Sequence, residues 1–294
     1  MPVDADRRTT RIGAAYALGA FGIWGVLPVY FKALAHVPAA ELLAHRIVWS
    51  LVLLVPMVWL AGRWGDLRIA LRSRPARRAL MASAALVGAN WGLYIWAVND
   101  GRLLETSLGY FINPLLNVAL GFAFLGERLS RWQWFAIALA AAGVINQTVA
   151  LGVLPWVPLA IAGTFAFYGL IRKTAPVDAL SGQLVEVIFL APAALTWLAL
   201  LAIWGEFSLG AFDRGTDLLI LASGIVTTVP LLCFTQAARR LKLSTVGFFQ
   251  YIGPTGHLLL AVLVYGEDFT VPRMITFGLI WAALAIYTID ARRR

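Results

Sequence analysis

Long apolar runs separated by short charged clusters follow one another along the whole chain. A helix needs about 20 consecutive apolar residues to cross a bilayer. By that measure the runs predict ten membrane-spanning helices, at residues 12–33, 39–61, 79–98, 103–125, 131–149, 153–171, 180–204, 217–238, 243–265 and 271–290. The pattern therefore predicts an all-α, multi-pass integral membrane protein whose surface faces the lipid bilayer.

The composition supports a membrane environment. Of the residues, 61% are hydrophobic and 13% are charged, and the mean hydropathy is +0.79. Soluble domains are about 45–50% apolar and about 25% charged. A net charge of +9 would suggest nucleic acid in a soluble protein. Here the cations cluster between apolar spans, so membrane topology explains them and no nucleic-acid partner is predicted.

The distribution of the 24 Lys and Arg residues predicts the orientation of the spans. Lys32, Arg102, Arg214 and Arg273 fall on one predicted side and Arg46 lies within a span, whereas all the others fall on the opposite side. Loops on the cytoplasmic side carry an excess of Lys and Arg. Both termini are therefore predicted to be cytoplasmic.

Two stretches break the apolar pattern in the same way. "GYFINPLLN" (109–117) and "QYIGPTGH" (250–257) each place a proline and several polar residues inside an apolar run. Pro114 and Pro254 correspond at an offset of 140 residues, and weaker matches follow in order on both sides.

This offset predicts two repeats, residues 1–150 with the first five helices and residues 151–294 with the last five. Because five is odd, the second repeat would enter the membrane upside down. Inverted repeats are typical of secondary transporters, whose binding site lies near the bilayer midplane between the repeats.

Polar stripes at helical spacing predict a shared, water-filled substrate pathway, because polar groups in hydrocarbon are costly unless paired or hydrated. The predicted pathway residues are Trp24, Asn90, Tyr94, Tyr110, Asn113, Asn117, Thr228, Gln250, Tyr251 and His257. Two alternatives stay open for these positions: hydrogen bonds between helices, and proline kinks without substrate contact.

Four ionisable residues within the spans are candidates for coupling or for intramembrane charge: His45, Arg46, Glu105 and Glu186. Charges inside the membrane are costly and mark functional sites. Arg46 is expected to pair with Glu105, because an unpaired buried charge is expensive. Proton coupling through Glu186 or His45 is one expectation. Uncoupled facilitation, with Glu186 in a permanent hydrogen bond, is the other.

Other motifs are interpreted as structural or are missing. Ser130 and Gln133 form a capping-box pattern at the start of the fifth span. Glu127 and Glu267 each follow a glycine in a turn and are expected to be structural. The chain has no HExxH, GxSxG or Walker A motif, so no enzyme activity, metal, cofactor or direct use of ATP is predicted.

Several strings resemble a known family: "HRIVWS" (45–50), "SLGYFINPL" (107–115), "GERL" (126–129), "IVTTVPLLCFT" (225–235) and "GFFQYIGPT" (247–255). They are similar to the RarD family, part of the EamA-type permeases of the drug/metabolite transporter superfamily. The resemblance implies ten helices in two inverted repeats, a central pathway and a bacterial inner-membrane location. The family is associated with chloramphenicol sensitivity, and relatives export amino acids and other metabolites.

The predicted function is therefore a secondary transporter that exports small metabolites or amphipathic drugs. A membrane receptor or scaffold, and an intramembrane enzyme, are the alternatives. The substrate, the transport direction, the coupling ion and the choice between monomer and homodimer stay open at the level of sequence.

Overall fold

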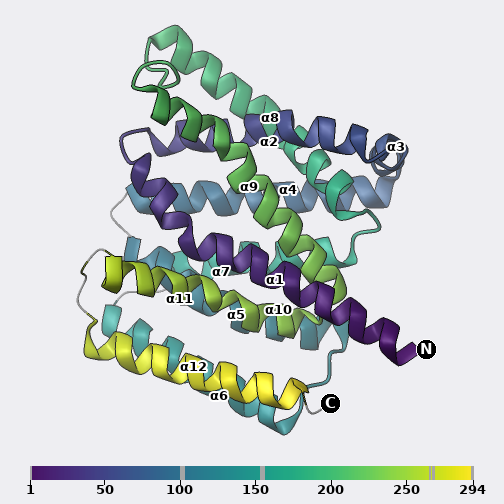
Figure 1. Cartoon of the computed structure of the whole chain (residues 1–294), viewed down its shortest axis with the longest axis vertical. Helices are drawn as coiled ribbons and strands as arrows, with labels where there is room; N and C mark the ends of the chain where they lie inside the picture. The colour runs from purple at the N-terminus through teal and green to yellow at the C-terminus, as the bar shows by residue number, and fades with distance from the viewer. Residues whose placement is uncertain (1, 100–102, 153–155, 265, 267–268, 293–294) are drawn as a thin grey trace.

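The structure is a computed structural model that describes residues 2–99, 103–152, 156–264, 266 and 269–292 (Figure 1). The regular elements of this part of the chain are all helical. They are α1 (Pro2–Ala33), α2 (Ala39–Leu60), α3 (Trp64–Arg72), α4 (Arg74–Asn99), α5 (Leu103–Leu125), α6 (Arg131–Leu151), α7 (Trp156–Thr174), α8 (Ala179–Trp204), α9 (Arg214–Arg240), α10 (Leu243–Gln250), α11 (Ile252–Leu259), the π-helical η1 (Leu260–Val264) and α12 (Val271–Arg292).

Within the described residues, every predicted span coincides with helical structure, with two differences. The ninth span is divided into α10, α11 and η1, with the division at Tyr251. The short helix α3 occupies a charged segment between spans, where no helix was predicted. Eight of the described helices are long and apolar enough to cross a membrane, and α4 and α7 are not among them. In α7, Arg172 and Lys173 lie within only 19 residues and lower its hydropathy.

The helices pack in pairs that join the two halves of the chain. In Figure 1, α6 and α12 lie together at the bottom of the bundle, and α2 and α8 lie near the top. Further contacts connect α5 with α7 and α10, α1 with α9 and α11, α4 with α7 and α8, and α2 with α9. Segments far apart in sequence therefore surround the centre of the bundle together.

Glycine allows the closest helix contacts. A Cβ atom added to Gly224 of α9 would lie 2.5 Å from the backbone carbonyl of Trp49 in α2. One added to Gly256 of α11 would lie 2.8 Å from the Cα atom of Gly25 in α1. Small residues bring helix backbones together in membranes, where van der Waals packing drives association. The crossings of α2 with α9 and of α1 with α11 therefore depend on these glycines.

Polar side chains cap two helices where sequence reasoning expected structural roles. The Ser130–Gln133 capping box is confirmed, with both reciprocal hydrogen bonds at 3.0 Å. The carboxylate of Glu127 accepts hydrogen bonds from the backbone N–H of Leu243 at 2.5 Å and from that of Ser244 at 3.0 Å. It thereby caps α10, so the structural interpretation of Glu127 is confirmed. Glu267 lies outside the described residues.

At the end of the bundle where α1 begins and α12 ends (Figure 1), cations fasten the α7–α8 loop to the end of α9. The Lys173 ammonium donates to the carbonyl of Ala238 at 2.7 Å. The Arg239 guanidinium donates to the carbonyls of Ala175 at 3.0 Å and Val177 at 2.8 Å. The bond to Ala238 satisfies a carbonyl in the last turn of α9, which would otherwise lack a partner. The bonds of Lys173 and Arg239 also join α7, α8 and α9 at this end.

Candidate functional site

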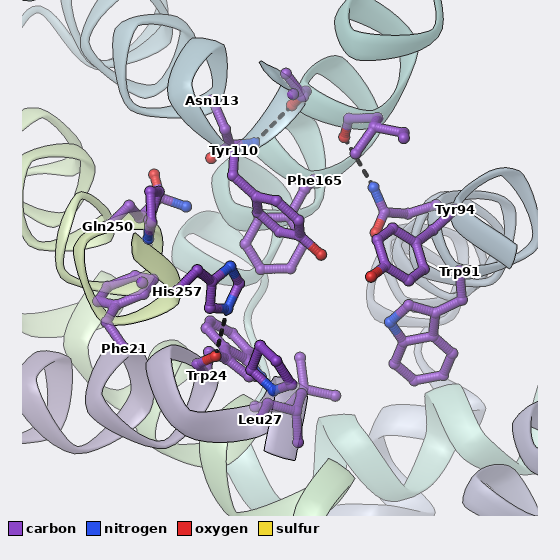
Figure 2. A pocket seen from close by; sticks show the side chains of 18 of the residues that line it. Phe21, Trp24, Leu27, Trp91, Tyr94, Tyr110, Asn113, Phe165, Gln250 and His257 are labelled. Atoms are coloured by element: carbon purple, nitrogen blue, oxygen red, sulfur yellow. Dashed lines mark hydrogen bonds between the residues drawn. The ribbon is translucent and has the colours of Figure 1, made fainter. Parts of the chain in front are cut away.

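A cavity of about 140 Å³ lies at the centre of the helix bundle (Figure 2). Its walls come from α1, α2, α4, α5, α7, α9, α10 and α11. Seven of the predicted pathway residues line it, namely Trp24, Asn90, Tyr94, Tyr110, Asn113, Gln250 and His257, and so does Arg46. The proline of the second broken stretch, Pro254, also lines it.

The cavity is displaced toward the end of the bundle opposite to the chain termini. Most of its lining comes from the C-terminal halves of α1 and α4 and the N-terminal halves of α2, α5 and α7. Consecutive spanning helices run in opposite directions, so all of these halves share one end.

Three predicted pathway residues are buried beside the cavity instead of lining it. Asn117 donates hydrogen bonds to the side-chain oxygens of Asn113, at 3.2 Å, and of Gln250. The Tyr251 hydroxyl donates to the carbonyl of Phe111 at 3.4 Å. Thr228 is fully buried, and its neighbour Thr227 lines the cavity. Successive residues of a helix point about 100° apart. The residue predicted on α9 is therefore one position away from the residue that faces the cavity.

The two asparagines of the cavity wall hold α7 in place. The Asn90 amide of α4 donates to the carbonyl of Ile161 at 2.8 Å and to the Thr164 hydroxyl at 2.9 Å. The Asn113 amide of α5 donates to the carbonyl of Ala162 at 2.7 Å. These are the interhelical hydrogen bonds that sequence analysis kept as an alternative. Both residues also line the cavity. Each therefore joins two helices and forms part of the cavity wall.

His257 connects the two halves of the chain at the cavity wall. Its Nε2 atom lies 2.9 Å from the carbonyl oxygen of Trp24, which accepts only, so Nε2 carries the hydrogen. The His257 ring stands perpendicular to that of Tyr110, with centroids 6.0 Å apart. Tyr110 is 40% exposed and faces Tyr94 at 6.2 Å. Figure 2 shows His257 and Tyr110 on one side and Tyr94 on the other.

Arg46 is the cation of the cavity wall. Its Nε atom donates to the Thr227 hydroxyl at 2.8 Å. Its guanidinium carbon lies 5.1 Å from the ring centroid of Trp91 and 5.5 Å from that of Phe31. The side chain of Glu105 lies outside the described residues, so the expected pair with Arg46 stays a prediction.

An aromatic cluster closes the cavity toward the end that holds the termini. Phe165 lies 5.6 Å from Trp24 and 5.0 Å from Phe234, and Phe234 stacks on Tyr168 at 6.0 Å. Phe234 and Tyr168 are fully buried. Sequence reasoning did not single out these residues, because aromatic side chains occur throughout the apolar runs and carry no distinguishing polar pattern.

Glu186 lies outside the cavity lining, in a fully enclosed polar cluster. Its Oε1 atom accepts a hydrogen bond from the Ser83 hydroxyl at 2.5 Å and lies 3.4 Å from Nε of Arg172. The Tyr168 hydroxyl donates to Oε2 at 3.5 Å. Arg172 was expected among the cations at the membrane surface, but it is fully buried. Glu186 supplies its countercharge, and Gly182, which lacks a side chain, leaves room for its guanidinium.

His45, the other candidate for proton coupling, lies in surroundings separate from those of Glu186. The Nε2 atom of His45 lies 3.5 Å from the Glu41 carboxylate. Glu41 is fully buried and accepts hydrogen bonds from the backbone and the hydroxyl of Ser208, at 2.7 and 2.6 Å. His45 therefore belongs to a contact between α2 and the α8–α9 loop.

Comparison with solved structures identifies the fold. The chain superimposes on a protein of known crystal structure with a TM-score of 0.73, covering 97% of this chain and 99% of that chain. The two sequences are 21% identical, so the match describes the fold alone.

Comparison of sequences identifies the family. Residues 11–146 match the model of the EamA-like transporter family. Protein RarD of Escherichia coli is 49% identical over 97% of both chains. An uncharacterized transporter of Vibrio cholerae is 50% identical over 99% of this chain and 96% of its own. The chloramphenicol-sensitive protein RarD of Pseudomonas aeruginosa is 34% identical over 96% of this chain and 95% of its own. The chain therefore belongs to the RarD group of the EamA-like transporter family.

Proposed function

We propose that the protein is a secondary transporter that exports small metabolites or amphipathic compounds across the bacterial inner membrane by alternating access. The observation that carries this proposal is the central cavity, which residues from both halves of the chain line together. A pocket with a few convergent polar groups in an apolar wall is the usual form of a small-molecule site. In transporters built from repeats, the site lies between the repeats.

The contact pattern supports two inverted repeats at residues 1–150 and 151–294. If α1, α2, α4, α5 and α6 correspond to α7, α8, α9, α10–α11 and α12, exchanging the halves converts the most extensive helix contacts into one another or into themselves. The contact of α1 with α9 becomes that of α7 with α4, and the contact of α5 with α7 becomes that of α11 with α1. The pairs α2–α8, α5–α10 and α6–α12 convert into themselves. This symmetry is what two equivalent five-helix units with ten spans would produce.

With both termini in the cytoplasm, as the distribution of cations predicts, the cavity lies toward the periplasmic side. The aromatic cluster of Phe165, Phe234 and Tyr168 would then separate it from the cytoplasm. The bonds of Lys173 and Arg239 would close the cytoplasmic end. We propose that the structure represents the outward-facing state, and that export requires these contacts to open.

The first test is the accessibility of the cavity to water. Cysteines placed at Tyr110, Gln250 or His257, after replacement of the single Cys233, are expected to react with a membrane-impermeant thiol reagent added from the periplasmic side. A cysteine at Ile145, exposed on α6, serves as the lipid-facing control and should stay unreacted. The proposal fails if the three cavity positions remain unreactive in every condition while periplasmic loop positions react.

Transport itself is tested in proteoliposomes. Accumulation of a compound that stabilises the purified protein would separate a transporter from a receptor, a scaffold or an enzyme. Binding without movement would favour a receptor, and chemical change of the compound would favour an enzyme.

The third test concerns Glu186 as the coupling residue. Proton uptake from the periplasm and release to the cytoplasm through Glu186 would couple proton entry to substrate exit. In Glu186→Gln the shape and the hydrogen bond from Ser83 remain possible, but no proton can be released. The change leaves Arg172 without its countercharge and lowers stability, so transport is compared in the folded variant, where it is expected to lose its dependence on a pH gradient while substrate binding survives. A wild-type response to the gradient would exclude Glu186 and leave His45, or uncoupled facilitation, as the alternatives.

A further inference from the structure

Among the described residues, the charge on the cavity wall has one sign. Arg46 lines the cavity, and none of the described residues that line it is Asp, Glu or Lys. Its guanidinium also forms no ion pair with any described side chain. An arginine offers five N–H donors, and the contact of Nε with Thr227 uses one of them. The terminal nitrogens are not among the described polar atoms that are sealed from solvent without a partner. None of the described groups takes up these donors, so among the described residues donors of Arg46 remain available from the cavity.

The surroundings of Arg46 fix its position. Trp91 and Phe31 lie within 5.1 and 5.5 Å of the guanidinium carbon, and Thr227 holds Nε at 2.8 Å. Aromatic faces attract a guanidinium, and its planar fork matches a carboxylate with two parallel hydrogen bonds. A fixed cation in an apolar cavity attracts anions more strongly than the same cation in water.

The rest of the wall sets the size and character of the other part of a ligand. Figure 2 shows Trp91 facing Leu27 and Trp24 across the cavity, with the rings of Tyr94 and Tyr110 beside them. The volume of about 140 Å³ is close to that of an apolar cavity of about 150 Å³ that binds benzene. The space therefore accommodates one ring or a short apolar chain together with a small charged group.

We propose that this cavity selects a small organic monoanion that carries one aromatic or apolar group, and that Arg46 binds the anionic group. The inference rests on the proposed transport function, because it takes the same cavity as the substrate site. In this proposal Arg46 determines which ligand binds, and proton coupling depends on other groups.

The test compares two ligands of nearly equal shape, benzoate and benzamide, on the purified full-length protein. Affinity is followed by quenching of tryptophan fluorescence, since Trp24 and Trp91 line the cavity. The wild-type protein is expected to bind benzoate at least tenfold more tightly than benzamide. Arg46→Gln is expected to weaken benzoate binding by about 10- to 100-fold, the usual effect of losing a hydrogen bond to a charged group, and to leave benzamide binding unchanged.

Two further variants make the comparison specific. Arg68→Gln removes an exposed cation on α3 and should bind both ligands like the wild type. Arg46→Lys keeps the positive charge but lacks the planar guanidinium. It replaces Arg46→Gln in the comparison if Arg46→Gln does not fold. It should bind benzoate several-fold more weakly than the wild type and benzamide equally well. Wild-type benzoate affinity in both Arg46 variants, or no preference for benzoate in the wild-type protein, would overturn the inference.

A transport measurement separates this inference from the proposed function. Benzenesulfonate keeps its charge and does not cross lipid unaided, so its uptake into proteoliposomes reports on the protein. Binding that depends on Arg46 without uptake would support the site and contradict transport by it. Uptake that is equal in wild-type protein and in Arg46→Gln would support transport and overturn the role of Arg46.

Discussion

The Arg172→Gln variant is expected to lose about 3–5 kcal/mol of folding stability, because removing one partner of a buried ion pair leaves the other uncompensated. Arg172 is fully buried, and its Nε atom lies 3.4 Å from the Glu186 carboxylate. Ser83 and Tyr168 also donate to that carboxylate, but neither supplies a positive charge. The loss is measured as the free energy of unfolding in detergent micelles, by denaturant titration.

The double variant Arg172→Gln/Glu186→Gln gives the matched comparison. It removes both charges and is expected to recover much of the lost stability, since replacing a whole buried pair is often close to neutral. Arg128→Gln, an exposed arginine in the α5–α6 turn, should change the stability by less than about 0.5 kcal/mol. If the double variant is no more stable than Arg172→Gln, the pair is not what stabilises this cluster.

The Gly224→Ala variant is expected to lose about 1–3 kcal/mol of stability or more, as overpacked cores do. The added Cβ atom would lie 2.5 Å from the backbone C and O atoms of Trp49, and backbone cannot move aside as a flexible side chain can. To relieve the clash, α2 and α9 must separate. Thr227 and Arg46 lie about one turn along the same two helices, so their 2.8 Å hydrogen bond should weaken as well.

Gly22→Ala in α1 is the control for this change. No atom lies within 4 Å of a Cβ added there, and alanine stabilises a helix by about 0.5–1 kcal/mol relative to glycine. Thermal unfolding in micelles should therefore place Gly22→Ala at or above the wild type and Gly224→Ala well below it. Equal midpoints for the two variants would show that α2 and α9 do not pack as closely as described.

The spans could be predicted because each needs a long apolar run, and lipid allows no other spanning structure for such a chain. The short amphipathic helix α3 was missed, because its nine residues fall within a charged segment that the topology argument treated only as a loop. The division of the ninth span at Tyr251 could not be predicted from the pattern of apolar residues either. Hydrophobicity records the length of a span and not the path of its backbone.

The candidate site was predictable where a polar side chain interrupts an apolar face, as at Asn113, Gln250 and His257. Prediction failed where rotation about a helix axis decides the outcome, as between Thr227 and Thr228. It also failed for Arg172, since a cation near a span end is usually exposed to water, and only the fold shows that Glu186 lies beside it. The aromatic cluster under the cavity carries no polar signal and could be recognised only from the packing.

The bonds made by Arg172, Lys173 and Arg239 bear on how the chain enters the membrane. In the proposed orientation these residues belong to the positive charge that directs insertion, and in the folded protein they also hold helix ends together. An experiment that inverts the protein by moving positive charge would therefore also break contacts of the folded state if it removed these three residues. A variant that is inserted in the correct orientation but folds wrongly would then be mistaken for an inverted protein. Charge moved from Arg68, Arg128 and Arg131, which are exposed, would test insertion alone.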